Sequence, residues 1–115
     1  NGFKTLNLDC LLVIGGEGTQ SIAQKLISKK IPIVGIPKTI DNDLPQTDKT
    51  IGFATCIDLV TESITRLQST AESHDRVMVL EVMGRDSGYI SLYGGLAGGA
   101  AAFKTGLFFP KPPIW

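Results

Sequence analysis

Short apolar runs alternate with helical patterns along this chain, and this alternation is what most limits the folds open to it. Residues 9–14 (DCLLVI) and 33–36 (IVGI) are continuous apolar runs, typical of strands buried on both faces of a parallel sheet. Between them, residues 19–30 place their isoleucines and leucine on one side of a helix, with Gly18 or Thr19 as its cap. This order predicts one strand–helix–strand unit with a right-handed crossover.

The second half of the chain continues the alternation. Residues 53–73 predict a long helix, and residues 76–82 (RVMVLEV) predict a third buried strand. The inward face of the long helix would carry Ile57, Val60, Ile64 and Leu67. Ser87 is expected to cap a short helix that runs into the small-residue patch GGLAGGAAA. The whole pattern predicts an α/β fold with a doubly wound parallel sheet.

Composition narrows the function classes. A chain of 115 residues suffices for one modest domain, and 11 basic against 11 acidic residues give no net charge. That balance argues against nucleic-acid binding, which usually leaves a basic excess. No apolar run reaches the roughly 20 residues of a membrane span. Cys10 and Cys56 lack metal-ligand spacing, so we expect two buried thiols and a cytoplasmic location.

Three loops rich in glycine or charge each follow a predicted strand. They comprise residues 15–19 (GGEGT), 37–48 (PKTIDNDLPQTD) and 83–88 (MGRDSG). Ligands bind at the carboxyl ends of the strands in a doubly wound sheet. We therefore expect the three loops to lie on one edge and to face one cleft.

The second loop concentrates Lys38, Thr39, Asp41 and Asp43. If the backbone after Pro37 is extended, the threonine and both aspartates project the same way. Two carboxylates so close repel, which favours a cation, a proton donor or a substrate hydroxyl between them. They can act as a general base with a supporting acid, or as two metal ligands. The lysine offers positive charge to a phosphoryl group and the threonine a hydroxyl donor. An Asx-rich turn is the alternative interpretation.

The first loop can cradle a phosphate with its backbone N–H groups at a helix N-terminus. It is not a Walker A loop, because no Gly-Lys-Ser/Thr follows, and it is a poor dinucleotide fingerprint. Glu17 makes sense there if it approaches phosphate through Mg2+. The alternative is a tight turn with an exposed glutamate. In the third loop, Arg85 can bind a substrate phosphate. Arg76, at the opposite edge, is either a surface cation or a contact to a neighbouring subunit.

Taken together, GGEGT, GIPKTIDNDL, TDKTIGFAT and EVMGRDSGYISLYGGLAGGA resemble the phosphofructokinase family, in order and from about residue 9 to residue 99. The resemblance implies a 6-phosphofructokinase, which transfers the γ-phosphate of ATP to the 1-hydroxyl of fructose 6-phosphate. It implies that Asp41 takes the hydroxyl proton and that Asp43 assists, with a share in organising Mg2+. Thr39 would contact the sugar or the transferred group.

The same resemblance assigns the other site residues. Fructose 6-phosphate would be held by Met83, Gly84 and Arg85, and by Arg76 from the adjacent subunit of a homo-oligomer. The nucleotide would contact the first loop, through Gly15, Gly16, Glu17, Gly18 and Thr19. Glu17 stands where the family usually has a Mg2+-binding aspartate, so it is the expected metal ligand.

Two positions bear on the phosphoryl donor. Gly18 matches the small residue of ATP-using members, where pyrophosphate users typically carry an aspartate. Lys38 is shared by pyrophosphate users and by one ATP-dependent branch. The combination favours ATP, with pyrophosphate as the alternative.

The resemblance ends near Gly99. We expect residues 1–99 to be a fragment of the catalytic core. Residues 100–115 (AAAFKTGLFFPKPPIW) are expected to be an atypical tail, disordered or frame-altered. The fragment alone is expected to be inactive. A non-catalytic module that binds sugar phosphates is the remaining alternative.

Overall fold

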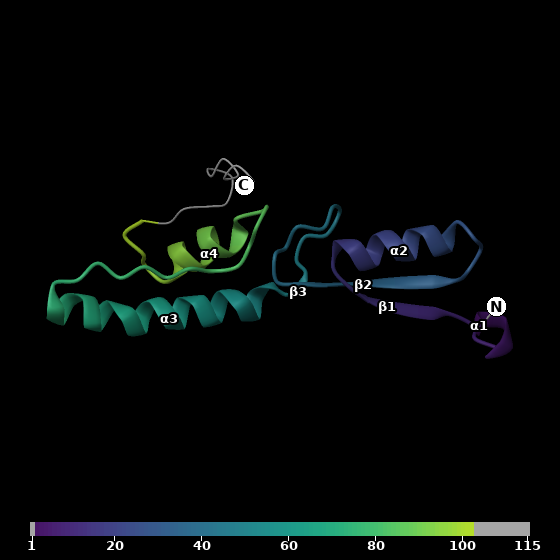
Figure 1. Ribbon diagram of the computed structural model, residues 1–115, viewed down its shortest axis with the longest axis horizontal. Helices are drawn as coiled ribbons and strands as arrows, with labels where there is room; N and C mark the ends of the chain where they lie inside the picture. The colour runs from purple at the N-terminus through teal and green to yellow at the C-terminus, as the bar shows by residue number, and fades with distance from the viewer. Residues whose placement is uncertain (1, 103–115) are drawn as a thin grey trace, which may run out of the picture.

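The computed structural model describes residues 2–102 in two halves that lie end to end (Figure 1). The elements are α1 (Gly2–Thr5), β1 (Leu11–Gly15), α2 (Glu17–Ile27), β2 (Ile33–Thr39), β3 (Ile51–Gly52), α3 (Phe53–His74) and α4 (Tyr89–Ala97). The first half holds β1, α2 and β2, and the second holds α3 and α4. The predicted tail falls almost wholly outside the described residues.

The strand–helix–strand unit is confirmed. β1 and β2 run parallel, in a register that pairs Leu11 with Ile33 and Gly15 with Pro37. The helix between them begins at Glu17, with Gly16 as its N-cap, so neither Gly18 nor Thr19 caps it as predicted. The turn is that tight because Gly15 lacks a side chain: a Cβ there would lie 2.5 Å from Thr19 Oγ1.

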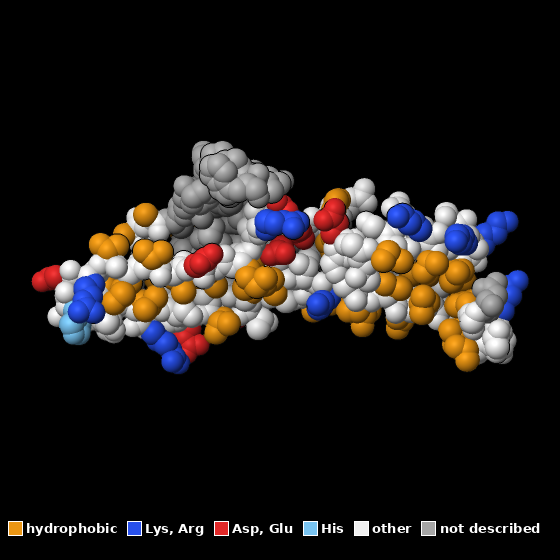
Figure 2. Space-filling model, viewed as in Figure 1, with side chains coloured by type: hydrophobic (Ala, Val, Ile, Leu, Met, Phe, Trp, Pro, Cys, Tyr) orange, Lys and Arg blue, Asp and Glu red, His pale blue; other side chains and the backbone are white. Residues whose placement is uncertain are grey.

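The prediction that these strands are buried on both faces is wrong for the described residues. Leu12 and Ile14 are 63% and 60% exposed, and Val34 is 51% exposed. The reason is that α2 covers one face of the strand pair, and no other described element packs on the opposite face. Figure 2 shows hydrophobic side chains gathered on the surface of this half.

The predicted third strand, residues 76–82, is also wrong. These residues are extended but unpaired, and Val77 and Val79 are 93% and 88% exposed. A strand needs a neighbour to take its backbone hydrogen bonds, whereas this segment runs back beside α3 toward α4 (Figure 1). The third strand of the sheet is instead the short β3, which pairs in parallel with Lys38 and Thr39 at the end of β2.

In the second half, α4 packs on α3 around a small core. Phe53, Val60 and Ile90 are buried there, with Ile57 and Ile64 partly buried against them. These include three of the residues predicted for the inward face of the long helix. The prediction that Ser87 caps α4 is wrong. Gly88 is the N-cap, at a φ of 66°, with no side-chain hydrogen bond.

Both cysteines in the described residues are free, which agrees with the expectation of thiols. Cys56 is partly buried on α3, but Cys10 is exposed just before β1, so the prediction of two buried thiols is wrong for Cys10. Among the described residues, no helix has the length and apolar character needed to cross a membrane.

Candidate active site

The three predicted loops lie near one another where the two halves of the molecule join, but no single hollow in the described residues is lined by all three. The first and second loops touch, since a Cβ added to Gly16 would lie 3.5 Å from Thr39 Cβ. The second and third loops are joined by Ser87, whose Oγ donates a hydrogen bond of 2.9 Å to the backbone oxygen of Asp41. Figure 2 shows acidic and basic side chains gathered at this junction.

The route to this convergence differs from the prediction. Only the first two loops follow paired strands, β1 and β2. The third loop follows the unpaired extended segment and is placed by α4, which begins directly after it and packs on α3. Sheet topology therefore positions two loops, and helix packing positions the third.

In the first loop, the backbone of residues 15–18 turns from β1 into the N-terminus of α2. Glu17 is the first residue of that helix and is exposed. Gly18 borders open space, because a Cβ added there would meet no heavy atom within 4 Å. The free N–H groups at such a helix end favour an anion.

The second loop starts as strand and then bends. β2 continues through Thr39, with Lys38 exposed and Thr39 partly buried. The chain bends at Ile40, and the Asp41 N–H donates a 3.2 Å hydrogen bond to Thr39 Oγ1. Asn42 then adopts a φ of 51°. The backbone is therefore not extended from Pro37 to Asp43, which was the condition for the threonine and both aspartates to project the same way, because local hydrogen bonding turns the chain after Thr39.

Asp41 has the most perturbed carboxyl group of the site. Burial raises its pKa, the charge of Asp43 raises it further, and Arg85 opposes both. Its Oδ1 is buried and has no hydrogen-bond partner in the part of the chain that the structure describes. A buried acceptor without a partner is costly unless something occupies it, so this oxygen is suited to receive a proton or a hydroxyl. Burial, and next the charge of Asp41, also raise the pKa of the neighbouring Cys56 thiol.

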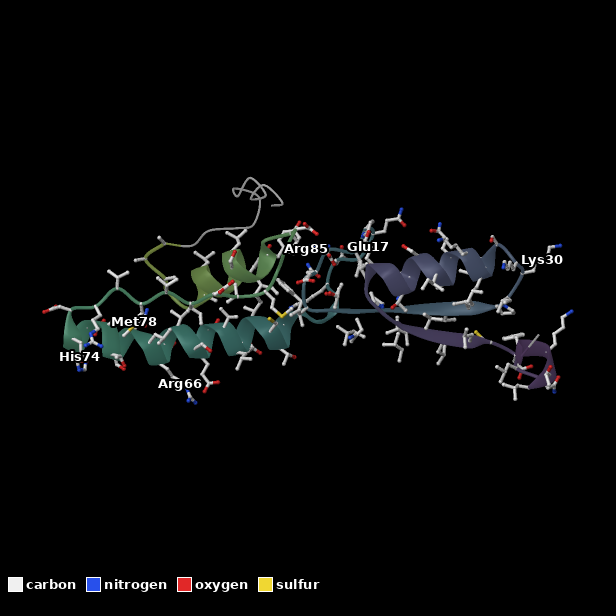
Figure 3. The ribbon with its side chains drawn as sticks, in the orientation of Figure 1. Glu17, Lys30, Arg66, His74, Met78 and Arg85 are labelled. Carbon is white, nitrogen blue, oxygen red and sulfur yellow. The ribbon has the colours of Figure 1, made fainter. Side chains whose placement is uncertain are left out.

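The third loop presents Arg85 to the solvent. Its Nε lies 2.8 Å from Asp86 Oδ2, in an exposed pair that contributes little to stability. The hydrogen bond to Asp86 and then the charge of Asp86 raise the pKa of Arg85 most, and the charges of Glu17 and Asp41 raise it further. Figure 3 shows Arg85 and Glu17 near each other across the junction. Gly84, at a φ of 116°, makes the turn, and Met83 is 73% exposed beside it.

The sequence predicted that Arg76 lies at the opposite edge from the three loops, and the structure also places it away from this junction. It directly follows α3, and its N–H donates to Ala71 O at the end of that helix. Figure 3 shows His74 and Met78, on either side of it in the sequence, at the opposite end of the second half from Arg85.

Several hydrogen bonds that hold the loops come from residues to which the sequence assigned no role in the site. Gln20 Nε2 donates to Gly15 O at 3.1 Å and to Ile36 O at 3.0 Å, which ties α2 to the ends of both strands. Asn42, Thr50 and Ser87 fix the second loop. The only sequence signal for them is their type: amides and hydroxyls near turns commonly bond to the backbone.

Two open hollows of about 340 and 630 Å3 flank the second loop and share Asn42, Asp48 and Tyr93. The larger is also lined by Asp43 and Ser87. Asp41 lines neither hollow; the aspartates that do are Asp48 in both, Asp58 in the smaller, and Asp43 and Asp86 in the larger.

The described residues contain no group of three side chains able to hold a metal ion by themselves. Glu17 offers one exposed carboxylate at the first loop. Mg2+ commonly binds through one or two carboxylates, with substrate phosphates and water as its other ligands. The donor set therefore fits an Mg2+ that shares Glu17 with a phosphate, and does not fit a metal held by protein alone.

The family model for phosphofructokinase matches residues 1–105 of this chain. The chain belongs to the phosphofructokinase family. An ATP-dependent 6-phosphofructokinase of Chloroflexus aurantiacus is 58% identical over 97 residues, which are 84% of this chain and 27% of that protein. A pyrophosphate–fructose 6-phosphate 1-phosphotransferase of Dictyoglomus thermophilum is 55% identical over 98 residues, or 85% of this chain and 28% of that protein.

A solved structure agrees with this membership. The T-state phosphofructokinase of Pichia pastoris matches with a TM-score of 0.81 and 31% identity, over 97% of this chain and 12% of that one. This chain therefore has the α/β fold of the family, as predicted. It spans little more than a quarter of the length of the two curated relatives.

Proposed function

We propose that this chain carries the catalytic loops of a 6-phosphofructokinase that transfers the γ-phosphate of ATP to the 1-hydroxyl of fructose 6-phosphate. One observation carries the proposal: Asp41 lies where the three loops meet, with a buried Oδ1 that has no partner in the described residues. We propose that a hydroxyl of the sugar becomes its partner when the substrate binds. Family membership supports the reaction class.

Asp41 acts as the general base. The 1-hydroxyl oxygen attacks the γ-phosphorus, its proton passes to Asp41, and ADP leaves with the electron pair of the broken P–O bond. Burial favours this role, because a raised pKa makes the carboxylate a better proton acceptor. Asp43 supplies the neighbouring negative charge, and Thr39 holds the Asp41 N–H while its own proton can reach the sugar or the transferred group.

The cationic residues divide between the substrates. Lys38 projects from the exposed side of β2, where it can stabilise the charge of the group in transfer. Arg85, with Met83 and Gly84, holds fructose 6-phosphate from the third loop. Arg76 lies just beyond the C-terminal end of α3, away from the junction, so we propose that it reaches the substrate phosphate of a neighbouring copy in a homo-oligomer.

The donor binds at the first loop. The backbone of Gly15, Gly16 and Thr19 at the N-terminus of α2 receives its phosphates, and the open space over Gly18 leaves room for the rest of ATP. Glu17 would hold Mg2+ together with those phosphates, and the bound ion would neutralise part of their charge. Pyrophosphate is the second candidate, because Lys38 is compatible with it and a curated relative is named for it.

A coupled assay on the intact protein tests the proposal. With Mg2+ and fructose 6-phosphate, ATP is expected to support turnover at a kcat/KM well above that with pyrophosphate. A reversed donor preference would select the second candidate, and no turnover with either donor would contradict the proposed function.

A polypeptide of these 115 residues alone is expected to show little or no turnover. One face of its β1–β2 pair and the segment around Val77 and Val79 are exposed, so the site lacks the support of packed neighbours. Ordinary kinase activity from this polypeptide would contradict that expectation.

A further inference from the structure

We propose that Thr50 and Asn42 are positioning residues, which hold the backbone around Asp41 so that its carboxylate meets the sugar hydroxyl. The proposal rests on the proposed function, because it concerns the residue named there as the base. Neither Thr50 nor Asn42 transfers a proton itself.

Thr50 is the anchor. It is 3% exposed and is the one polar residue that is buried in the described part of the chain, although Lys49 before it and Ile51 after it are exposed. Its Oγ1 donates a 2.7 Å hydrogen bond to the backbone oxygen of Thr39. Breaking this short bond would cost free energy, since the Thr39 oxygen would lose its donor and only Asn42 Oδ1 would remain as an acceptor for the hydroxyl.

Asn42 completes this set of hydrogen bonds from the other side of Asp41, and we call the hydrogen bonds of Thr50 and Asn42 the clasp. Its Oδ1 accepts the Thr50 N–H at 2.8 Å and lies 3.3 Å from Thr50 Oγ1. Its Nδ2 donates to Asp48 O at 3.4 Å. The residue has a φ of 51°, a conformation that asparagine adopts more readily than most side chains do.

The clasp therefore brackets the base. Thr50 fixes Thr39, two residues before Asp41, and it fixes Asn42, one residue after Asp41. Ser87 fixes the backbone oxygen of Asp41 itself. Apolar packing also contributes here, because Leu44 is buried and the partly buried Ile40 packs against the core of Phe53, Val60 and Ile90. A misplacement of about 1 Å can lower an enzymatic rate on the order of 100-fold.

The experiment compares Thr→Val variants of the intact protein. Thr50→Val removes the hydroxyl donor and keeps the branched shape, and Thr50→Ser restores the donor. Thr61→Val is the matched control, because the Thr61 Oγ1 is buried in α3 with no hydrogen-bond partner in the described residues. Thr50→Val is expected to lower kcat at least tenfold while the KM for fructose 6-phosphate changes less than twofold. Thr50→Ser should recover most of the kcat, and Thr61→Val should match the parent.

A second variant keeps the test open if Thr50→Val fails to fold. Asn42→Gly retains access to the positive φ and deletes the clasp on its own side, so it should lower kcat with the same small change in KM. A kcat within twofold of the parent in the folded Thr50→Val or Asn42→Gly protein would overturn the proposal. Asp41→Asn, assayed in parallel, separates the two claims: full turnover in that variant means that the proposed base is wrong, whatever the clasp does.

Discussion

Gly94 is where a single added methyl group should disturb both the packing of the second half and the site. A Cβ at this position would lie 2.5 Å from Val60 Cγ1 and 2.9 Å from Val60 Cβ. Carbon atoms pack best at about 3.5–4.0 Å, so the overlap is on the order of 1 Å. Rotation of the Val60 side chain moves its Cγ1 but not its Cβ, so α4 itself must move away from α3.

The expected cost of Gly94→Ala follows from two opposing terms. Overpacking of this kind costs about 1–3 kcal/mol. Alanine regains about 1 kcal/mol as a better helix former than glycine. The net loss in the free energy of unfolding is therefore about 0–2 kcal/mol, with a midpoint of about 1 kcal/mol. Because α4 begins directly after Ser87 and Gly88, its movement should also weaken the Ser87–Asp41 hydrogen bond and lower kcat.

Urea unfolding of the intact protein measures the cost, with the m value checked for constancy. Val60→Ala alone should cost about 1.6 kcal/mol, from two methyl groups at about 0.8 kcal/mol each. The double variant should lose less than the sum by at least about 0.5 kcal/mol, because the shortened side chain makes room for the new methyl group. Gly18→Ala, in open space on α2, is the stability control and should not destabilise. A Gly94→Ala protein more stable than the parent, or strict additivity in the double variant, would refute the steric reasoning.

Three further predictions concern the site. Asp43→Asn removes a negative charge that raises the pKa of Asp41, so the acidic limb of the pH profile of kcat/KM should move to lower pH; an unmoved or raised limb contradicts the coupling. Asp41 has a raised pKa in the folded state, so its ionisation destabilises the fold once the pH rises past the pKa that Asp41 has in the unfolded chain. Asp41→Asn should therefore raise Tm at neutral pH and lose that gain in acid. A lowered Tm at neutral pH would contradict this prediction. Gly18→Asp places a carboxylate in the open space over the first loop, so kcat/KM with ATP should fall at least tenfold relative to that with pyrophosphate; an unchanged ratio would remove Gly18 from donor selection.

The first half of the fold could be predicted because its signals are local. The apolar run before Gly15 and the glycine turn define β1 and the start of α2, and the actual bounds differ from the predicted ones by a few residues. What the local pattern could not give is how many neighbours a strand has. Leu12 and Val79 lie in equally apolar runs, yet one is on a paired strand and the other on an unpaired segment.

The members of the candidate site stand out in the sequence, but the residues that support them do not. Asp41 and Arg85 stand out because charged groups in loops after apolar runs suggest chemistry. Their meeting depends on Ser87, Gln20 and Thr50, whose hydrogen bonds span from 5 to 46 positions in the sequence. A polar side chain carries no mark of a partner so far along the chain, so only the folded arrangement reveals it.

The central claim is that Asp41, held where three loops meet, accepts the proton of the sugar hydroxyl. Its most direct test is the kcat of Asp41→Asn in the intact protein, measured beside calorimetric binding of fructose 6-phosphate. Asp75→Asn, at the far end of α3, serves as the matched control. A general base contributes on the order of 100- to 10,000-fold, so kcat should fall by at least about 100-fold while the Kd for fructose 6-phosphate stays within a few-fold. A kcat within tenfold of the parent would contradict the claim.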